Sequence, residues 1–228
     1  MAETQAILFD IDGTLITTGG ASDRAWKRAF QELQGVDVDV PAVTGKGVPD
    51  PEVGRVVFKN AIGRDPTEEE ADALMRRRLD HLPEEVENSP GFKVQDCVVE
   101  LLEKLIDDGV LLGLTTGNVE EAAHIKLQRA NLNRFFSFGG YGSDSPDRTE
   151  LTKKALERAA IVSGRTVEPE HCFSCGDTPR DVEAGHGAGI RVTGVATGEF
   201  TVEGLKEAGA DAAITSFCDG LPLLQSSR

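Results

Sequence analysis

The feature that most limits the fold is an alternation of short apolar runs with stretches whose apolar residues recur at helical spacing. The apolar runs with the length of strands cover residues 6–9, 110–115, 135–138, 172–175, 190–195 and 212–214. Helices are predicted before Gly109, after Asn118, whose residue type often caps helices, and after Thr149. Strands that alternate with helices form a parallel sheet covered on both faces, and ligands of such sheets bind at the carboxyl ends of the strands.

Residues 15–90 interrupt this alternation, because they contain no convincing strand. Three helices are predicted there from their start signals, which are Ser22 before an apolar stripe, Asp50 before a proline, and a capping box that begins at Thr67. The basic run 76–78 lies near the end of the third helix, where a solvated surface that compensates the helix dipole is expected.

The chain therefore divides into two predicted parts. Residues 1–15 and 90–228 form an α/β core with a Rossmann-like parallel sheet, and residues 16–89 form a small all-helical cap inserted after the first strand.

The charge of the chain disfavours several classes of partner. Among 228 residues, 24 Lys and Arg stand against 39 Asp and Glu, which gives a net charge of -15. Such a surface repels nucleic-acid backbones and anionic membranes. No apolar run approaches the roughly 18 residues that cross a bilayer, and the first residues lack the pattern of a secretory signal. We expect a cytoplasmic protein, a monomer or homodimer, that binds neither nucleic acid nor membrane.

Two of the four cysteines, Cys172 and Cys175, form a C-x-x-C sequence. The two-residue period of a strand sends positions three apart to opposite faces. No further close-spaced zinc ligands are present. We predict that both are buried structural thiols.

The first chemical signal is ILFDIDGTLI, in which Asp10 and Asp12 follow an apolar strand. Residues i and i+2 of an extended chain face the same side, so the two carboxylates repel each other unless a cation or a proton lies between them. A divalent metal would resolve this repulsion, and an aspartate can form an aspartyl-phosphate. Taken alone, the same residues also fit a polar turn.

Two more strands end in polar residues. LLGLTTGN ends in Thr116, Gly117 and Asn118 before a helix, where backbone N–H groups can bind an anion, although an ordinary loop fits equally well. SCGDTPRDVEAG places Asp177 at a strand end and Asp181 in the following helical turn, where helix-dipole stabilisation alone would account for it. Three such strand ends in this order are much harder to explain as ordinary turns than any one of them is alone.

Together these residues resemble the haloacid dehalogenase superfamily of aspartate-nucleophile hydrolases over nearly the whole chain. The resemblance implies that Asp10 attacks phosphorus, and that Asp12 protonates the leaving group and later activates water. It implies that Thr116 holds the phosphoryl group, helped by backbone N–H groups near Gly117 and Asn118.

The resemblance also implies a Mg²⁺ site. The Asp10 carboxylate, the Asp12 main-chain carbonyl and Asp177 would form it, and Asp181 would support it. The sequence departs from the family at the basic residue, which is usually a lysine in a K-P-x-P stretch. Here the segment reads SDSPDRTELTKKALERA, and Arg148 is the best match, with Lys153 and Lys154 as rivals.

Asp12 and Asp177 favour a Mg²⁺-dependent phosphatase within this superfamily, because the namesake dehalogenases lack the second aspartate and need no metal. The small helical cap most resembles phosphoglycolate phosphatase-like members, which act on small phosphomonoesters. The loop 44–47, with Lys46, is a candidate for reading the leaving group, or simply a glycine-rich connection. The alternatives are a β-phosphoglucomutase-like mutase and a catalytically silent phosphate-binding member.

Overall fold

The core of the protein is a six-stranded parallel sheet. In the computed structural model, which describes residues 5–225, the strands follow the order β5-β4-β1-β6-β7-β8, so that β1 lies between β4 and β6. Their bounds are β1 Ala6–Phe9, β4 Leu111–Thr115, β5 Phe138–Gly140, β6 Cys172–Gly176, β7 Arg191–Val195 and β8 Ala212–Ile214. The predicted α/β fold with a parallel sheet is confirmed.

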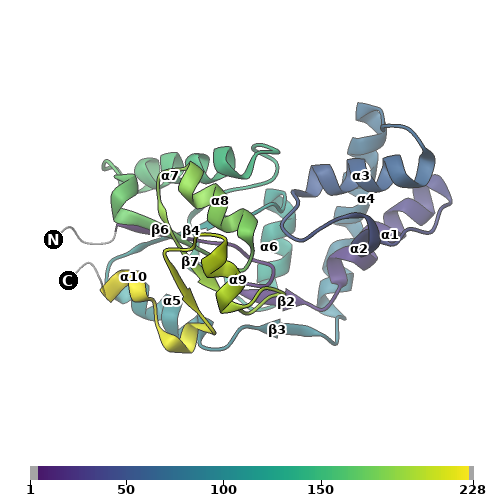
Figure 1. Cartoon of the computed structure of the whole chain (residues 1–228). Coiled ribbons are helices and arrows are strands. Elements are labelled where there is room, and N and C mark those ends of the chain that lie inside the picture. The colour runs from purple at the N-terminus through teal and green to yellow at the C-terminus, as the bar shows by residue number, and fades with distance from the viewer. Residues whose placement is uncertain (1–4, 226–228) are drawn as a thin grey trace.

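Helices cover both faces of the sheet. Helices α7 (Arg148–Ser163) and α8 (Pro179–Gly187) lie on one face, and α5 (Val98–Asp107) and α10 (Pro222–Gln225) lie on the other (Figure 1). The remaining helices of the core are α6 Glu120–Gln128, α9 Val202–Glu207 and three 3-10 turns at Asn133–Phe135, Pro169–His171 and Phe217–Asp219.

Strand β1 shows why its sequence is apolar throughout. Ala6 and Leu8 belong to the hydrophobic cluster on the α7 side, whereas Ile7 and Phe9 belong to the cluster on the α5 side. Because successive side chains of a strand point to opposite faces, a strand covered on both faces must be apolar at every position.

The C-x-x-C cysteines follow the same rule. Cys172 packs into the cluster on the α7 side and Cys175 into the cluster on the α5 side, and both are buried free thiols. Burial raises the pKa of the Cys172 thiol to about 11 and that of Cys175 still further. The predicted buried structural thiols are confirmed.

The strand predicted at residues 135–138 is shifted in the structure. Residues 133–135 form a 3-10 turn, in which the backbone N–H of Phe136 donates to the carbonyl of Asn133, and strand β5 begins only at Phe138. Two of the three residues of β5 are glycines, which have low strand propensity, so the aromatic residues before them gave the stronger strand signal.

The insertion contains four helices rather than three. These are α1 Ala21–Gln34, a short α2 Val40–Val43, α3 Asp50–Ile62 and α4 Glu68–Glu87, and Figure 1 shows them grouped to one side of the core. The expectation of no strand there was wrong, because β2 (Ile16–Thr18) pairs antiparallel with β3 (Phe92–Val94) and the two form the entry and exit of the insertion. A three-residue strand shows no period that a sequence pattern can reveal.

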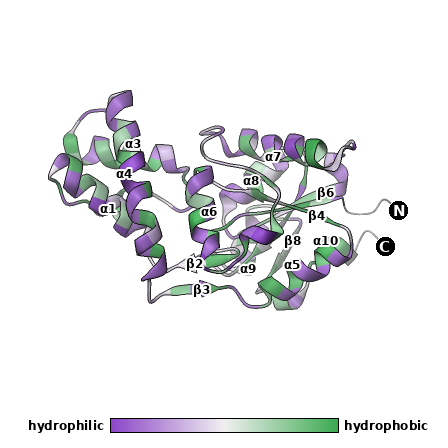
Figure 2. Cartoon of the chain, turned by 180° about the vertical axis from the view of Figure 1, so that it is seen from behind, coloured by the Kyte–Doolittle hydropathy of each residue, from purple (hydrophilic) through white to green (hydrophobic). Residues whose placement is uncertain are grey.

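The inserted helices enclose a hydrophobic cluster of their own, which includes Trp26, Phe30 and Phe58. Figure 2 shows that α1, α3 and α4 alternate between hydrophobic and hydrophilic residues, as amphipathic helices do. The predicted capping box is present at the start of α4, where the side chains of Thr67 and Glu70 each accept a hydrogen bond from the other residue's backbone N–H.

Two features of the insertion differ from the sequence prediction. Arg78, expected to be solvated, is fully buried and forms an ion pair with Asp50, whereas Arg76 is exposed. Asp50 is not the cap of α3, since that position belongs to Pro49. Its carboxylate instead accepts from Arg78 and from the backbone N–H of Val119 in the core. Buried charges occur chiefly as such pairs.

A disulfide joins Cys97 and Cys218, which are 121 residues apart in the sequence. It connects the N-terminus of α5 to the 3-10 turn that follows β8, so it ties the middle of the chain to its C-terminal part. Within residues 5–225, no helix is long and apolar enough to cross a membrane.

Candidate active site

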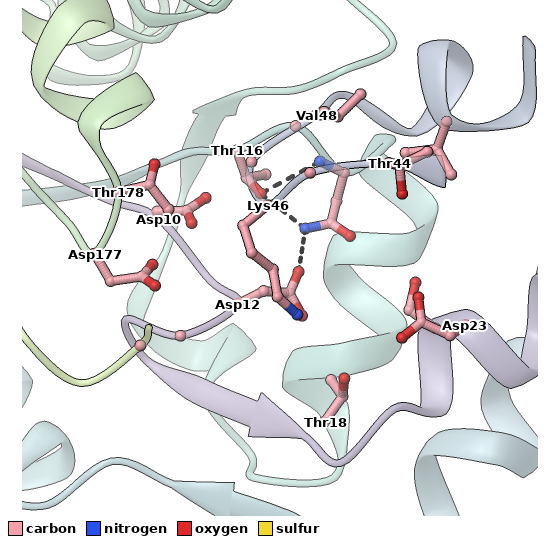
Figure 3. Close-up of a pocket in the computed structure, with 18 of the residues that line it drawn as sticks. Asp10, Asp12, Thr18, Asp23, Thr44, Lys46, Val48, Thr116, Asp177 and Thr178 are labelled. Atoms are coloured by element: carbon pink, nitrogen blue, oxygen red, sulfur yellow. Dashed lines mark hydrogen bonds between the residues drawn. The ribbon is translucent and has the colours of Figure 1, made fainter. Parts of the chain in front are cut away.

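Three adjacent strands end at one cavity and bring the predicted site residues together. Because β1 lies between β4 and β6, the segments 10–14, 116–118 and 177–181 that follow these strands meet at one edge of the sheet. They line a cavity of about 540 Å³, whose other wall is formed by residues of the insertion (Figure 3). The strand ends that the sequence analysis singled out therefore share one site.

Three buried aspartates form an acidic cluster beside this cavity, and two of them, Asp10 and Asp177, line it. Asp10, Asp177 and Asp181 each offer a carboxylate oxygen within 4.8 Å of the others. Burial and the charge of Asp181 raise the pKa of Asp10 to about 7, although Arg148 opposes this rise. Burial and the charges of Asp10 and Asp181 raise the pKa of Asp177 to about 8. The cluster thus carries more negative charge than the surrounding protein compensates.

The space around Asp177 is kept open by two glycines. A Cβ atom at Gly13, whose φ is +87°, would lie 2.3 Å from Oδ2 of Asp177, and one at Gly198 would lie 1.8 Å from the same oxygen. The hydroxyl of Thr14 donates to the other oxygen, Oδ1, at 3.1 Å. Both glycines are therefore required for this carboxylate to occupy its position.

Arg148 is the basic residue that the structure places beside the cluster. Its Nη2 lies 3.6 Å from Oδ1 of Asp10 and donates a hydrogen bond to Oδ1 of Asp181, and its Nη1 donates to the carbonyl oxygen of Gly47 in the insertion at 3.1 Å. Its Nε is buried and has no hydrogen-bond partner among the described residues. A buried N–H without a partner is costly, so it is available to an anionic ligand.

The rival lysines lie elsewhere. Lys153 and Lys154 are 47% and 48% exposed and pair with Glu150 and Glu157 on the surface of α7. The structure thus brings Arg148, and neither of these lysines, to the cavity.

Thr116 and Asn118 follow β4 and are both buried. Oγ1 of Thr116 accepts a hydrogen bond from Nδ2 of Asn118 at 2.8 Å. Asn118 is not the helix cap that its type suggested, because α6 begins at Glu120 with Val119 in the cap position. Its side chain lines the cavity instead, and its Nδ2 also donates to Oδ2 of Asp12 at 2.7 Å.

Lys126 is a site residue that the sequence analysis did not identify. Its Nζ donates to Oδ2 of Asp12 and to Oδ1 of Asn118, both at 2.6 Å, from the buried face of α6. A signal for it exists in the sequence, since a lysine at position 126 continues the apolar stripe of Val119, Ala122 and Ala123. Lysine on such a stripe needs a buried acidic partner.

The wall of the cavity that the inserted residues form carries two further charged residues. Lys46, in the loop that the sequence analysis singled out, has its Nζ 3.6 Å from Oε1 of Glu199, and both side chains are well exposed. Asp23, in the first turn of α1, lines the same wall. Burial raises the pKa of Asp23, whereas the nearby Lys46 and Lys126 lower it.

Known proteins resemble the chain over most of its length. The family model described as haloacid dehalogenase-like hydrolase matches residues 7–195. A phosphoglycolate phosphatase of Aquifex aeolicus is 29% identical, with 82% of each chain covered. An N-acetylmuramic acid 6-phosphate phosphatase of Pseudomonas aeruginosa is 28% identical, with 85% of this chain and 82% of the relative covered.

Solved structures share the fold. The crystal structure of CbbY from Rhodobacter sphaeroides in complex with phosphate has a TM-score of 0.73 and 20% identity, and the match covers 98% of this chain and 99% of that one.

Proposed function

The chain belongs to the haloacid dehalogenase-like hydrolase family and is a phosphoric monoester hydrolase of that family, and from this premise we propose that it hydrolyses a small phosphomonoester with Mg²⁺, through an aspartyl-phosphate on Asp10. The observation that carries the proposal is the position of Asp10. Its carboxylate lies in the wall of the cavity, beside two further aspartates and 3.6 Å from the guanidinium of Arg148. A carboxylate so placed can attack a phosphorus atom beside the positive charge of Arg148.

The residues around Asp10 fit a divalent metal. Carboxylate oxygens are the donors that Mg²⁺ prefers, and the pKa values of Asp10 and Asp177, which burial and the neighbouring carboxylates raise, support a site that a cation would stabilise. We assign the site to the carboxylates of Asp10 and Asp177 and the main-chain carbonyl of Asp12, with Asp181 in support. When bound, the metal would neutralise charge on the transferring phosphoryl group.

The protein's own groups then have distinct tasks. An oxygen of Asp10 forms a bond to phosphorus while the bond from phosphorus to the leaving oxygen breaks, and Asp12 gives that oxygen a proton. In the second step water attacks the phosphorus of the aspartyl-phosphate, Asp12 takes its proton, and phosphate leaves. Thr116 and the N–H groups near Gly117 hold the phosphoryl oxygens.

Arg148 would neutralise charge on the transferring phosphoryl group. Its unpartnered Nε and its position beside Asp10 support a contact with the phosphoryl group. A guanidinium presents a planar fork of donors where the family's lysine would present a point charge.

The substrate is proposed to be a small phosphorylated metabolite in the cytoplasm. The cavity of about 540 Å³ lies between the core and residues 16–89, which we propose act as its cap. In this proposal the loop that carries Lys46 contacts the leaving group, which agrees with its place in the cavity wall.

The proposal is tested by measuring phosphate release from p-nitrophenyl phosphate with Mg²⁺ and with EDTA. Activity should require Mg²⁺ and should be abolished in Asp10→Asn. Full activity of that variant would refute the role of Asp10. A coupled assay for isomerisation of glucose 1-phosphate with a trace of bisphosphate distinguishes a mutase from a phosphatase. Ligand binding without turnover across a panel of phosphomonoesters would favour a silent member.

A further inference from the structure

Lys126 differs from every other lysine of the chain in its burial. It is 2% exposed, whereas the eight others are all exposed. Transferring an ammonium group out of water is costly unless charged and hydrogen-bonding partners compensate it. Burial of the Lys126 ammonium beside the candidate active site therefore carries a considerable desolvation cost.

The partners of this ammonium lie in the site itself. Lys126 Nζ donates to Oδ2 of Asp12 and to Oδ1 of Asn118, each at 2.6 Å, and Nδ2 of Asn118 donates to the same Oδ2 of Asp12 at 2.7 Å. The three side chains form a closed triangle of hydrogen bonds. Asn118 is fixed in turn by Thr116, so the triangle is anchored to both β4 and α6.

This triangle uses only one oxygen of Asp12. Both donors reach Oδ2, and Oδ1 accepts no hydrogen bond from residues 5–225, although the side chain is 39% exposed and lines the cavity. Oδ1 is therefore the oxygen that remains available to a ligand. Arg148 instead contacts Asp10 and Asp181, so the two cations pair with different aspartates of the D-x-D motif.

We infer that Lys126 is a positioning residue for proton transfer, which together with Asn118 holds Oδ2 of Asp12 so that Oδ1 meets the leaving oxygen of the substrate. The inference rests on the proposed phosphatase function. Although burial opposes the change, Lys126 and Asn118 lower the pKa of Asp12, so that Asp12 releases its proton readily. That proton moves from Oδ1 to the leaving oxygen as the bond from phosphorus to this oxygen breaks. Asp12 regains a proton from the water that attacks the aspartyl-phosphate, and Lys126 keeps its own proton throughout.

This role predicts a dependence on the leaving group. A poor leaving group such as an alkoxide needs the proton from Asp12, whereas 2,4-dinitrophenolate leaves without it. Loss of the positioning residue should therefore slow the transfer from alkyl phosphates much more than the transfer from 2,4-dinitrophenyl phosphate. A lysine that only stabilised the fold would affect both substrates to the same extent.

The experiment compares Lys126→Met, Lys126→Arg and Asn118→Ser with the wild type and with Lys153→Met, an exposed-lysine control. The measured quantity is kcat/KM for glycerol 3-phosphate and for 2,4-dinitrophenyl phosphate at saturating Mg²⁺, since kcat/KM covers the steps up to phosphoryl transfer. Thermal unfolding and inhibition by inorganic phosphate show whether each variant is folded with an intact phosphate site.

Lys126→Met is expected to lose about 10²-fold or more on glycerol 3-phosphate and less than about threefold on 2,4-dinitrophenyl phosphate. Asn118→Ser should show a smaller loss with the same selectivity, and Lys126→Arg should recover part of it. Equal losses on both substrates in folded Lys126→Met and Asn118→Ser would overturn the inference. The proposed function would survive that result, because it depends on turnover of both esters by the wild type.

Discussion

Arg78 and Asp50 form a buried, two-pronged ion pair, in which Nη1 lies 2.8 Å from Oδ2 and Nη2 lies 3.0 Å from Oδ1. The pair joins α4 to the start of α3. Arg78 also donates to Ser22 of α1, and Asp50 accepts from the backbone N–H of Val119 in the core. One ion pair thus connects three inserted helices with the loop that follows β4.

Removing one partner of this pair should be strongly destabilising. Arg78→Met leaves the carboxylate of Asp50 buried without its guanidinium, and we expect the free energy of unfolding to fall by about 3–5 kcal/mol in urea titrations. The exposed Arg76→Met is the matched control and should change it little. The double variant Arg78→Met, Asp50→Leu should lose less free energy of unfolding than the sum of the losses in the two single variants. Wild-type stability of Arg78→Met would contradict this account.

The acidic cluster should make the stability of the metal-free protein depend on pH. The pKa values of Asp10 and Asp177 in the folded protein, about 7 and about 8, lie above the ordinary 3.8, so the folded state binds protons more tightly than the unfolded state. Their contribution is fully present below the ordinary pKa and is lost as pH rises through the folded values. The melting temperature in EDTA should therefore fall between about pH 5.5 and about pH 8.5.

Mg²⁺ should counter this loss, because the proposed metal site consists of the ionised carboxylates. Its stabilising effect is expected to be larger at about pH 8.5 than at about pH 5.5. The variant Asp177→Asn should show a flatter pH dependence in EDTA and a weaker response to Mg²⁺. A melting temperature in EDTA that rises over this range, or a Mg²⁺ effect that is greater in acid, would disagree with the charge assignment.

Replacing Arg148 should weaken catalysis more than replacing either neighbouring lysine. Arg148→Met removes the cation beside Asp10 and should lower kcat/KM for p-nitrophenyl phosphate by about 10²–10³-fold. Arg148→Lys keeps the charge without the fork of donors, so an intermediate loss is expected. Lys153→Met and Lys154→Met serve as controls that should retain activity, since both side chains lie on the surface of α7. A larger loss in either lysine variant would reverse the assignment.

The disulfide should contribute measurably to stability. It closes a loop between residues 121 apart, and such a crosslink typically contributes about 2–4 kcal/mol by restricting the unfolded chain. Cys97→Ala with Cys218→Ala should lower the urea midpoint, and dithiothreitol should have no further effect on that variant. Thiol titration of the wild type in urea should find the two thiols of Cys172 and Cys175, and four after reduction. Four thiols without reductant would exclude the bond.

Asp23 should influence which leaving groups are accepted. It lines the cavity and makes no hydrogen bond or ion pair within residues 5–225, whereas the nearby cations Lys126 and Lys46 are paired with Asp12 and Glu199. An unpaired carboxylate favours a leaving group that donates hydrogen bonds and repels one that is anionic. We therefore expect 2-hydroxyethyl phosphate and phosphoethanolamine to be better substrates than phosphoglycolate, which has a similar size.

A substitution at this position tests the charge alone. Asp23→Asn keeps an acceptor but removes the charge, so it should raise kcat/KM for phosphoglycolate and lower it for phosphoethanolamine, by about tenfold in the latter case. 2-Hydroxyethyl phosphate should change least, and p-nitrophenyl phosphate reports general damage to the site. Unchanged ratios among the three small esters would show that Asp23 does not contact the leaving group.

The sequence predicted those parts of the site that depend on local order. Asp10, Thr116 and Asp177 each follow an apolar strand, and parallel strands bring such positions to one edge of a sheet, so the common site could be anticipated. Arg148 could be placed by its distance from the start of a helix. The helical insertion was visible because its capping signals and apolar stripes are local as well.

The remaining features depend on pairs that are far apart in the chain. Lys126 meets Asp12 across 114 residues, and Arg78 meets Asp50 across 28, so no local pattern shows which partner either residue has. Arg78 was expected to be solvated because most arginines lie at the surface. The disulfide was missed for the same reason, since the spacing of cysteines does not determine which of them meet.

The open space around Asp177 gives a criterion for tracing this activity among relatives. A protein that retains the aspartates but carries any side chain at the positions of Gly13 or Gly198 cannot keep this carboxylate where it lies here, since a single Cβ would come within 2.3 Å and 1.8 Å of Oδ2, respectively. Such a relative would have to move the strand end or lose the proposed metal ligand. The residues at these two positions can thus distinguish relatives that retain this arrangement of the site from relatives that retain only the aspartate motif.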